Sequence, residues 1–571
     1  MRDDLRERCH RSKNKYNFDR RKGPVIVERN DDGVRQQPVN IAKISDRAWR
    51  YLSYALFLSV LIIILITFLD YGLTADEEFQ RVYGDYVISW YTSFFRDRSA
   101  LSYFNLNLYG GFFEVIAQLA SRVIPLGVYE TRHLINALFG LLAIVTTYKL
   151  GSRLSNPMGG LLSALFLTVT PVFYGHIFNN SKDIPFLALV LVSFYFLFQS
   201  YKLLPRLPKS LIIKLGISIG LTMGIRVGGL ILLGYTAVFW ACWLIVQWRL
   251  KFTGISESLS KTLLRLSLSM ASVAILAWIV MTVFWPWAQT KPLTNPFRAM
   301  EQTAHFDTKI VVLFDGDKVP AIDLPSSYIP TWFALTMPEF YFASLLVGIF
   351  FAYRFFRRFK NDEFDFERLV KVGMLVFAFC FPIAAAILLR STAYNGLRHF
   401  IFLIPMLALI SGISVAALLT SNAGKIIKLI AVVLILFSVG LTVLDMFQLH
   451  PYQVIYFNRL IAGGLKHASQ RYETDYWGMT YREGAEWVIN NYHPPSEEKI
   501  RVASCSTPFI AGYYFDQSEE AKQRFDYVAR NEKPRIFIAT TKCQRKRPGN
   551  IIHTVERQGT LLLYVLETED Q

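Results

Sequence analysis

The stretch YGLTADEEFQ, residues 71–80, follows directly on an apolar run that covers residues 51–69. A run of that length can cross the hydrocarbon core of a bilayer as a helix, which takes about 20 residues. Asp76, Glu77 and Glu78 come next, close to the end of the run. Ionisable groups near bilayer depth are costly and usually serve a purpose. The stretch therefore predicts a membrane-spanning helix that is followed by a functional acidic loop.

The composition of the whole chain agrees with a polytopic α-helical membrane protein. Of its 571 residues, 53% are hydrophobic and only 18% are charged, whereas soluble domains carry about 25% charged residues. The segment 103–128 is apolar but contains Glu114 and Arg122, so we expect its helices to lie in the interface or to re-enter the membrane rather than to cross it. The sequence predicts about eleven spans, at residues 51–69, 131–151, 158–175, 185–202, 210–225, 229–248, 265–285, 333–353, 369–389, 399–420 and 426–446.

The loop charges predict which side each end of these helices faces. Three loops, KLLPRLPK, QWRLKFTGISESLSKTLLR and RFFRRFKNDEFDFER, are rich in Lys and Arg, as cytoplasmic loops are. Residues 1–50 are polar and basic, which is typical of a cytoplasmic tail and not of a signal peptide. We therefore attribute the net charge of +17 to the tail and the inner loops, and expect no nucleic-acid partner. The membrane domain would then cover residues 51–446.

The segment 447–571 has a different character and predicts a small α/β domain outside the membrane. TYREGAEWVINNY has helical spacing, while KIRVASCS, RIFIAT and TLLLYVLE are typical of strands. Cys505 and Cys543 both lie in this segment. A disulfide between them would suit an oxidising compartment, but their spacing alone leaves it open. If this domain contributes to the function, its candidate residues are Glu473, Asp475, Tyr481, Arg482 and Glu483.

The predicted topology brings polar residues from distant segments to one side of the membrane. They lie in the acidic loop, at the start of the second span, in YGHIFNNSKDIPF, in TMGIRVGGL and in YNGLRHFIFLIP. Taken singly, each has an ordinary explanation as a lipid-facing arginine, a solvated turn or a helix cap. Their joint placement favours a site instead. The candidates are Asp76, Glu77, Glu78, Arg132, His176, Asn180, Lys182, Asp183, Arg226, Arg398 and His399.

These residue types suit a transfer reaction with a phosphate leaving group. A carboxylate can take the proton from an acceptor hydroxyl and so make its oxygen a better nucleophile. The planar guanidinium of arginine binds phosphate oxygens through two parallel hydrogen bonds and stays charged. A second carboxylate can orient the acceptor or hold a cation.

Several stretches resemble the GT-C fold of integral-membrane glycosyltransferases, and in particular glycosyltransferase family 39, which includes the dolichyl-phosphate-mannose–protein mannosyltransferases and bacterial aminoarabinose transferases. The resemblance covers residues 70–571. It implies a polyprenyl-phosphate sugar donor, such as undecaprenyl or dolichyl phosphate, and inverting transfer on the outer side of the membrane. The stretches are DEEFQRVYGDY, RHLINALFGLLAIVTTYKLG, NNSKDIPF, GIRVGGL, VFWPWAQTKPLTNPFRAM, LPSSYIPTWFALTMPE, NGLRHFIFLIP and DYWGMTYREGAEWV.

By this resemblance Asp76 is the expected base, Glu77 the second member of the acidic pair, and Asp183 the second acid. Arg398, and more loosely Arg226, would meet the donor phosphate. We expect the rest of the polar face to contact substrate: Glu78, Lys182, His176, Asn180, His399 and Arg132. The register of the pair, Asp76–Glu77 or Glu77–Glu78, stays open. The C-terminal segment does not resemble the β-trefoil domain of eukaryotic protein mannosyltransferases, which weakens the expectation of a protein acceptor. The acceptor could be a protein, a lipid or a glycan.

No cofactor is expected to be required, although Asp76, Glu77, Asp183 and His176 could hold a divalent cation with oxygen ligands. Two other functions remain: a lipid or sugar transporter or flippase, and a non-catalytic assembly protein with the same fold. A transporter usually shows an internal repeat and interrupted helices in both halves, which this sequence does not show. The expected location is the bacterial inner membrane, among membrane lipids, with the N-terminus in the cytoplasm and the site outside it.

Overall fold

The computed structural model describes residues 45–250, 258–304, 306, 308–357, 365–493, 499–505, 508–543 and 548–568. Most of the predicted basic tail, residues 1–44, lies outside this described part. Among the described residues, eight helical segments are long and apolar enough to cross a membrane. Their helices are α1 (Asp46–Thr67), α4 (Val128–Leu154), α7 (Asp183–Ser200), α9 (Ile231–Arg249), α10 (Leu259–Val283), α15 (Phe366–Leu388), α16 (Ile404–Thr420) and α17 (Lys425–Leu449).

Two further pairs of helices have a sharp bend between them, and each pair is long and apolar enough to form a broken span or a re-entrant loop. Helices α5 (Pro157–Thr168) and α6 (Pro171–Asn179) meet at 68°, and α13 (Tyr328–Thr336) and α14 (Glu339–Arg357) at 106°. A proline disfavours helical backbone at the preceding residue. Thr170, before Pro171, and Met337, before Pro338, are accordingly extended. The sequence predicted both spans, but as continuous helices.

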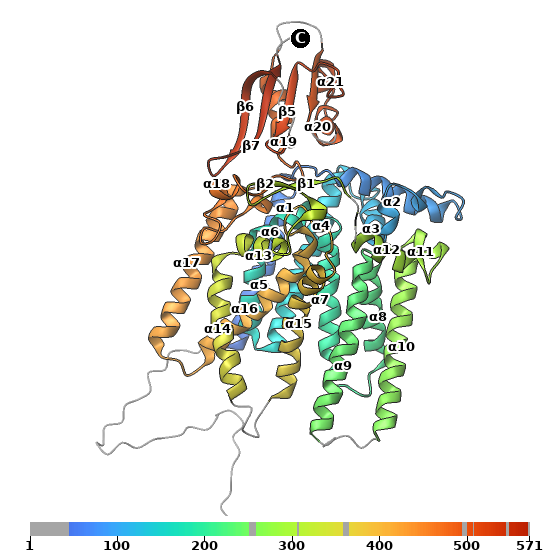
Figure 1. The fold of residues 1–571 in the computed structure, drawn as a ribbon, viewed down its shortest axis with the longest axis vertical. Coiled ribbons are helices and arrows are strands. Elements are labelled where there is room, and N and C mark those ends of the chain that lie inside the picture. The colour runs from blue at the N-terminus through green and yellow to red at the C-terminus, as the bar shows by residue number, and fades with distance from the viewer. Residues whose placement is uncertain are drawn as a thin grey trace, which may run out of the picture. The chain divides into compact units, whose positions relative to one another are not determined.

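Helix α8 (Lys209–Met223) covers the remaining predicted span, 210–225, with 15 residues. All eleven predicted segments therefore fall on helices or helix pairs. Helices α4, α7, α8, α9 and α10 run side by side in Figure 1, and their packing is confirmed by contacts of α7 with α4 and α8, and of α10 with α8 and α9. The polytopic helical architecture predicted from the sequence is confirmed.

Shorter elements connect these spans at the end where the candidate residues were predicted. They are α2 (Glu77–Thr92), α3 (Phe112–Ser121), α11 (Pro286–Thr290), α12 (Asn295–Ala304) and a hairpin of β1 (Val311–Phe314) and β2 (Asp317–Pro320). Helix α3 lies in the apolar segment 103–128. Its ten residues rise only about 15 Å, half of a hydrocarbon core. This segment therefore does not cross, as predicted.

The C-terminal segment forms a five-stranded sheet in the order β4–β3–β5–β7–β6. Strand β3 pairs in parallel with β4 and β5, while β7 pairs antiparallel with β5 and β6. Figure 1 shows β5, β7 and β6 side by side. The strands are β3 (Ile500–Ser504), β4 (Phe525–Tyr527), β5 (Ile536–Thr540), β6 (Gly549–Arg557) and β7 (Thr560–Thr568), and the helices of this segment are α18 (Leu465–Ala468), α19 (Tyr481–Asn491), α20 (Pro508–Phe515) and α21 (Glu519–Arg524).

The four elements predicted in this segment are confirmed as α19, β3, β5 and β7. Helix α19 contacts β5, β6 and β7, and α20 contacts β3 and β4, so the apolar strands are covered. Cys505 and Cys543 form a disulfide that joins the segments just after β3 and β5. The spacing had left this bond open, and the parallel pairing of β3 with β5 explains why the two thiols meet.

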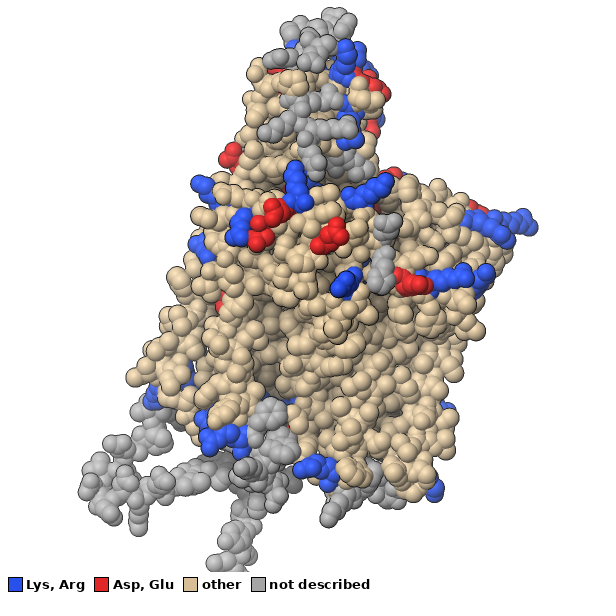
Figure 2. Space-filling model, viewed as in Figure 1, with Lys and Arg blue, Asp and Glu red and all other residues tan. Residues whose placement is uncertain are grey.

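The charged side chains of the spanning helices lie toward the two ends of these helices. Figure 2 shows a broad band between these ends that is almost free of charge. One end carries mainly Lys and Arg, at the start of α1, α10, α15 and α17 and at the end of α4, α9 and α14: Arg47, Arg50, Lys261, Arg265, Arg368, Lys371, Lys425, Lys428, Arg153, Arg249, Arg354 and Arg357. The opposite end carries charges of both signs and holds the candidate residues.

Candidate active site

Arg398 lies between two carboxylates that come from distant parts of the chain. Its Nη2 donates to Asp76 Oδ2 at 2.5 Å, and its Nε donates to Asp183 Oδ2 at 3.3 Å. Arg226 Nη2 lies 2.6 Å from the other oxygen of Asp183. Two acids and two arginines that were predicted from four separate segments therefore form one cluster.

The local fold explains why these side chains meet at one end of the helices. Asp76 is the residue before α2, and Asp183 opens α7. Arg398 opens a 3₁₀ turn, Arg398–Leu403, that leads into α16. Arg226 precedes a similar turn, Val227–Leu230, before α9. Because each residue stands where a helix begins, a single end of the bundle collects all four.

The two carboxylates differ in their access to a ligand. The Asp183 side chain is 5% exposed and contacts both arginines. The Asp76 side chain is 34% exposed. An incoming hydroxyl can therefore reach Asp76, whereas Asp183 is placed to hold Arg226 and Arg398.

Positive charge dominates the surroundings of Asp76. Burial raises the pKa of the Asp76 carboxyl, but the charges of Arg398 and Lys182 outweigh this effect, so the pKa lies below its usual value. Burial also lowers the pKa of the Lys182 ammonium to about 8, against the attraction of Asp76. Asp76 is therefore ionised at neutral pH, as a proton acceptor must be.

Aromatic rings surround the cluster, and the sequence predictions did not single them out. The guanidinium carbon of Arg398 lies 4.5 Å from the Trp477 ring centroid. Lys182 Nζ lies 4.4 Å from the Tyr109 centroid, and Arg226 approaches the same ring at 5.6 Å. Trp477 stands in the stretch DYWGMTYREGAEWV and Tyr109 in the first loop, so only their neighbourhood was predicted.

His176 and Asn180 lie next to the cluster. Tyr476 Oη is 3.2 Å from His176 Nε2, and Asn180 Nδ2 is 3.3 Å from His176 Nδ1. Asn180 Oδ1 also accepts the backbone N–H of Asp183 at 3.1 Å. These residues shape the loop between α6 and α7. His399 packs its ring edge-on against Tyr394, with 4.8 Å between the centroids.

Glu77 points away from the cluster, although it neighbours Asp76. Its Oε2 accepts the backbone N–H of Thr74 at 2.8 Å and the Thr74 hydroxyl at 3.1 Å, and its Oε1 lies 2.8 Å from His133 Nε2. The residue is 1% exposed. Its carboxylate is thus occupied within the protein, at the start of α2.

Glu78 and Arg132 also have partners outside the cluster. Glu78 pairs with Arg81 at 2.7 Å and accepts the hydroxyl of Tyr129. Arg132 Nη2 donates to the buried Glu114 at 2.5 Å. Of the three consecutive acids, Asp76 alone contacts Arg398 among the described residues. Asp76 is therefore the acid of the three that lies beside Arg398, while the register of a catalytic pair stays a prediction.

The four residues considered for a divalent cation do not form a metal-binding group. No three His, Cys, Asp or Glu residues in the described part of the chain are placed to hold a metal ion together. Glu77 is separated from the others by its bonds to Thr74 and His133. The expectation that no cofactor is required stays a prediction.

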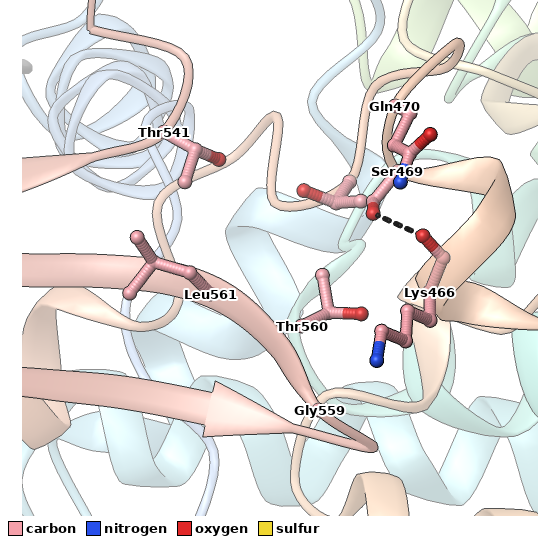
Figure 3. Close-up of a pocket in the computed structure, with 8 residues that line it drawn as sticks. Lys466, Ser469, Gln470, Thr541, Gly559, Thr560 and Leu561 are labelled. Atoms are coloured by element: carbon pink, nitrogen blue, oxygen red, sulfur yellow. Dashed lines mark hydrogen bonds between the residues drawn. The ribbon is translucent and has the colours of Figure 1, made fainter.

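A cavity of about 250 Å³ lies elsewhere, between α18 and the turn that joins β6 to β7 (Figure 3). None of the predicted site residues lines it. Its wall consists of uncharged polar groups, one lysine, one glycine and one leucine: Lys466, Ser469, Gln470, Thr474, Thr541, Gly559, Thr560 and Leu561. Without a carboxylate or an arginine, this cavity lacks the groups for phosphate-linked transfer.

A family model described as dolichyl-phosphate-mannose-protein mannosyltransferase matches residues 127–287 of the chain. The match confirms the predicted family resemblance. The matched region contains Arg132, His176, Lys182, Asp183 and Arg226, while Asp76 and Arg398 lie outside it. No protein among the curated sequences matches the chain.

The chain is also similar to several solved structures. ArnT from Cupriavidus metallidurans in the apo state is 14% identical, with 91% of this chain and 98% of that chain covered and a TM-score of 0.47. The same protein bound to undecaprenyl phosphate is 14% identical, with 92% of this chain and 100% of that chain covered and a TM-score of 0.46. The oligosaccharyltransferase of Archaeoglobus fulgidus in the apo form is 12% identical, with 83% of this chain and 65% of that chain covered and a TM-score of 0.47.

Proposed function

We propose that the protein is an inverting glycosyltransferase that moves a sugar from a polyprenyl-phosphate donor to an acceptor hydroxyl. The observation that carries the proposal is the Arg398 guanidinium, which bridges the partly exposed Asp76 and the buried Asp183. This arrangement supports a role for Asp76 as proton acceptor and for Arg398 as the group that binds the donor phosphate. The matched family description, which names a dolichyl-phosphate-linked sugar, supports the same class of donor.

The reaction is a single displacement at the anomeric carbon. Asp76 takes the proton of the acceptor hydroxyl, and the acceptor oxygen forms a bond to the anomeric carbon. The bond from that carbon to the phosphate oxygen breaks on the opposite side, and its electron pair leaves with the phosphate. The products are the glycosylated acceptor and polyprenyl phosphate. Attack from the side opposite the leaving group inverts the anomeric centre.

The cations of the site stabilise the leaving phosphate. Negative charge develops on the phosphate oxygen as the bond breaks, and preorganised positive groups stabilise it most where water is scarce. Arg398, Arg226 and Lys182 are the cations at this place. Asp183 keeps both arginines oriented through its two oxygens. It acts as a positioning residue, whereas Asp76 meets the acceptor.

We further propose that the site faces the outside of a bacterial inner membrane, with the N-terminus in the cytoplasm. Cytoplasmic ends of spanning helices carry an excess of Lys and Arg, and the end opposite the site has this excess. The disulfide between Cys505 and Cys543 suits an oxidising compartment. Both features support the same orientation.

The proposal is tested with purified protein and radiolabelled polyprenyl-phosphate sugars, offered one at a time with candidate protein, lipid and glycan acceptors. We expect wild type to consume one donor. Asp76→Asn should bind that donor but transfer its sugar about 10²–10⁴-fold more slowly, the range of general-base assistance.

Asp70→Asn is the matched control, because Asp70 lies on the same loop but pairs with His450 at 2.9 Å. It should retain wild-type turnover. Equal turnover by Asp76→Asn and wild type would refute the role of Asp76. No consumption of any donor by wild type would instead favour the transporter or the assembly function.

A further inference from the structure

The segment Glu473–Thr480, which links the membrane helices to α19, forms one wall of the site. Trp477 in this segment is 4% exposed. The Arg398 guanidinium lies over its ring at 4.5 Å, and the ring of His176 packs edge-on against it at 5.2 Å. The indole ring is thus enclosed by two residues of the candidate site, so a sugar cannot stack on its face.

A tight turn fixes the conformation of this segment. Asp475 Oδ1 accepts the backbone N–H groups of Gly478 at 2.8 Å and Met479 at 3.0 Å. Asp475 Oδ2 accepts from the N–H and the hydroxyl of Thr480 at 2.9 and 2.5 Å. Gly478 has a φ of +79°, a conformation that glycine adopts without strain. The buried carboxylate of Asp475 therefore organises the backbone that carries Trp477.

The same segment is tied to the acidic loop. The backbone N–H of Ala75 donates to the carbonyl oxygen of Trp477 at 3.1 Å. Asn179 Nδ2 reaches Met479 Sδ at 3.1 Å. Ala75 is the residue before Asp76, and Asn179 precedes the loop that holds Lys182 and Asp183. Trp477 is thus held in register with both carboxylates that bind Arg398.

We propose that Trp477 is a positioning residue that holds Arg398 for the donor phosphate, so that the C-terminal segment completes the membrane site. The inference rests on the proposed function. When a phosphate enters, it competes with Asp76 for the guanidinium of Arg398, while Asp183 keeps its contact with Nε. The ring of Trp477 is neutral and attracts the guanidinium through its face. It therefore does not repel the phosphate, as a further carboxylate beside Arg398 would. Arg398 therefore keeps Trp477 as a neutral partner while its ion pair with Asp76 is exchanged for the phosphate.

The test compares Trp477→Phe with Trp477→Leu and Trp477→Met in the full-length enzyme. Phenylalanine retains an aromatic face, while leucine and methionine fill the space without one. We expect Trp477→Phe to stay within about threefold of wild type, and the two aliphatic variants to raise the donor KM by about three- to thirtyfold with little change in kcat, the range between an exposed and a desolvated cation–π contact. Trp487 in α19 provides the control, because its ring stacks on that of His553 in β6 with 4.4 Å between the centroids. Trp487→Leu should leave the donor KM unchanged.

A double-mutant cycle separates positioning of Arg398 from a general structural role. If Trp477 acts through Arg398, the effect of Trp477→Leu on the donor KM should largely disappear in an Arg398→Lys background. An undiminished effect there, or equal KM values for Trp477→Leu and wild type, would overturn the inference. So would a loss in Trp477→Phe as large as that in Trp477→Leu. Methionine, which adapts to irregular space, provides the aliphatic variant if leucine prevents folding.

These results are distinguishable from a failure of the proposed function. If wild type transfers no sugar from any donor, the proposed function fails. If wild type is active and the aliphatic variants equal it, only the role of Trp477 fails.

Discussion

At the scale of single residues, Lys182 is the cation of the site whose charge can change near neutral pH. Its ammonium lies over Tyr109 at 4.4 Å. Burial lowers its pKa to about 8, and Asp76 partly opposes this shift, while Arg398 and Arg226 add to it. Arginine, in contrast, stays protonated at all working pH values. Any dependence of donor binding on Lys182 should therefore appear as a pH effect just above neutrality.

We predict that the donor KM of the wild-type enzyme rises about tenfold between pH 7 and pH 9. Over that interval a lysine with a pKa of about 8 falls from about nine-tenths to about one-tenth charged, since a tenfold change in proton concentration shifts the ratio of its two forms tenfold. The phosphodiester of the donor keeps its charge over the same range. Initial rates at several donor concentrations and pH values measure the effect.

Lys182→Arg provides the control for this prediction, because its guanidinium stays charged at pH 9. Its donor KM should be nearly independent of pH. A wild-type KM that does not change between pH 7 and pH 9 would show that Lys182 does not bind the donor through its charge.

The residue scale also shows the limit of sequence prediction for this site. Asp76, Asp183, Arg226 and Arg398 were predicted to share one side of the membrane, and the structure brings them into contact. The sequence could not say which of the three consecutive acids belongs with them. Successive residues at a helix start point about 100° apart, so adjacent carboxylates face different neighbours. Only the tertiary structure, which places the start of α2 beside the start of α4, determines that Glu77 contacts His133.

At the scale of elements, Glu77 connects the start of α2 to α4. It accepts two hydrogen bonds from Thr74 and lies 2.8 Å from His133. We predict that Glu77→Ala destabilises the protein, because an unsatisfied buried polar group costs about 1–3 kcal/mol. The measurement is the thermal unfolding midpoint in detergent. The protein that remains folded should keep donor turnover within a few-fold of wild type.

Glu78→Ala is the neighbouring control, because the pair of Glu78 with Arg81 is partly exposed and such pairs contribute about 0–1 kcal/mol. Its midpoint should fall less than that of Glu77→Ala. A folded Glu77→Ala protein without any turnover would instead return Glu77 to the catalytic role predicted from the sequence.

Spans were predictable as elements because apolar runs of sufficient length have few alternatives in a membrane. The bends between helices and the short strands were harder to predict from the sequence. The hairpin β1–β2 was missed inside a long loop, although VVLFDGDKVP carries a signal for it. Asp315 and Gly316 both have positive φ, as the Asp-Gly pair of a two-residue hairpin turn requires. The bends at Pro171 and Pro338 were likewise marked by proline, but a proline can also sit in the first turn of an unbroken helix.

At the scale of the whole molecule, two independent features predict the same orientation. Lys and Arg gather at the end of the helices opposite the site (Figure 2), and the disulfide joins Cys505 to Cys543 in the segment beyond α17. A disulfide that closes a loop of this size stabilises a fold by about 2–4 kcal/mol. In a reducing compartment that contribution would be lost. The orientation can be tested without any knowledge of the substrate.

We predict that Glu519→Cys in intact cells reacts with a membrane-impermeant maleimide, while Lys425→Cys reacts only after the cells are opened. Glu519 is exposed at the start of α21, and Lys425 is exposed at the first residue of α17. Because α17 is a single spanning helix that ends at Leu449, the two positions belong to opposite sides of the membrane. Both substitutions are made in a protein whose Cys9, Cys242 and Cys380 are replaced by serine, so that the disulfide leaves no other reactive thiol. Labelling of Lys425→Cys but not of Glu519→Cys in intact cells would place Asp76 and Arg398 in the cytoplasm, and the donor would then have to present its sugar on the inner leaflet.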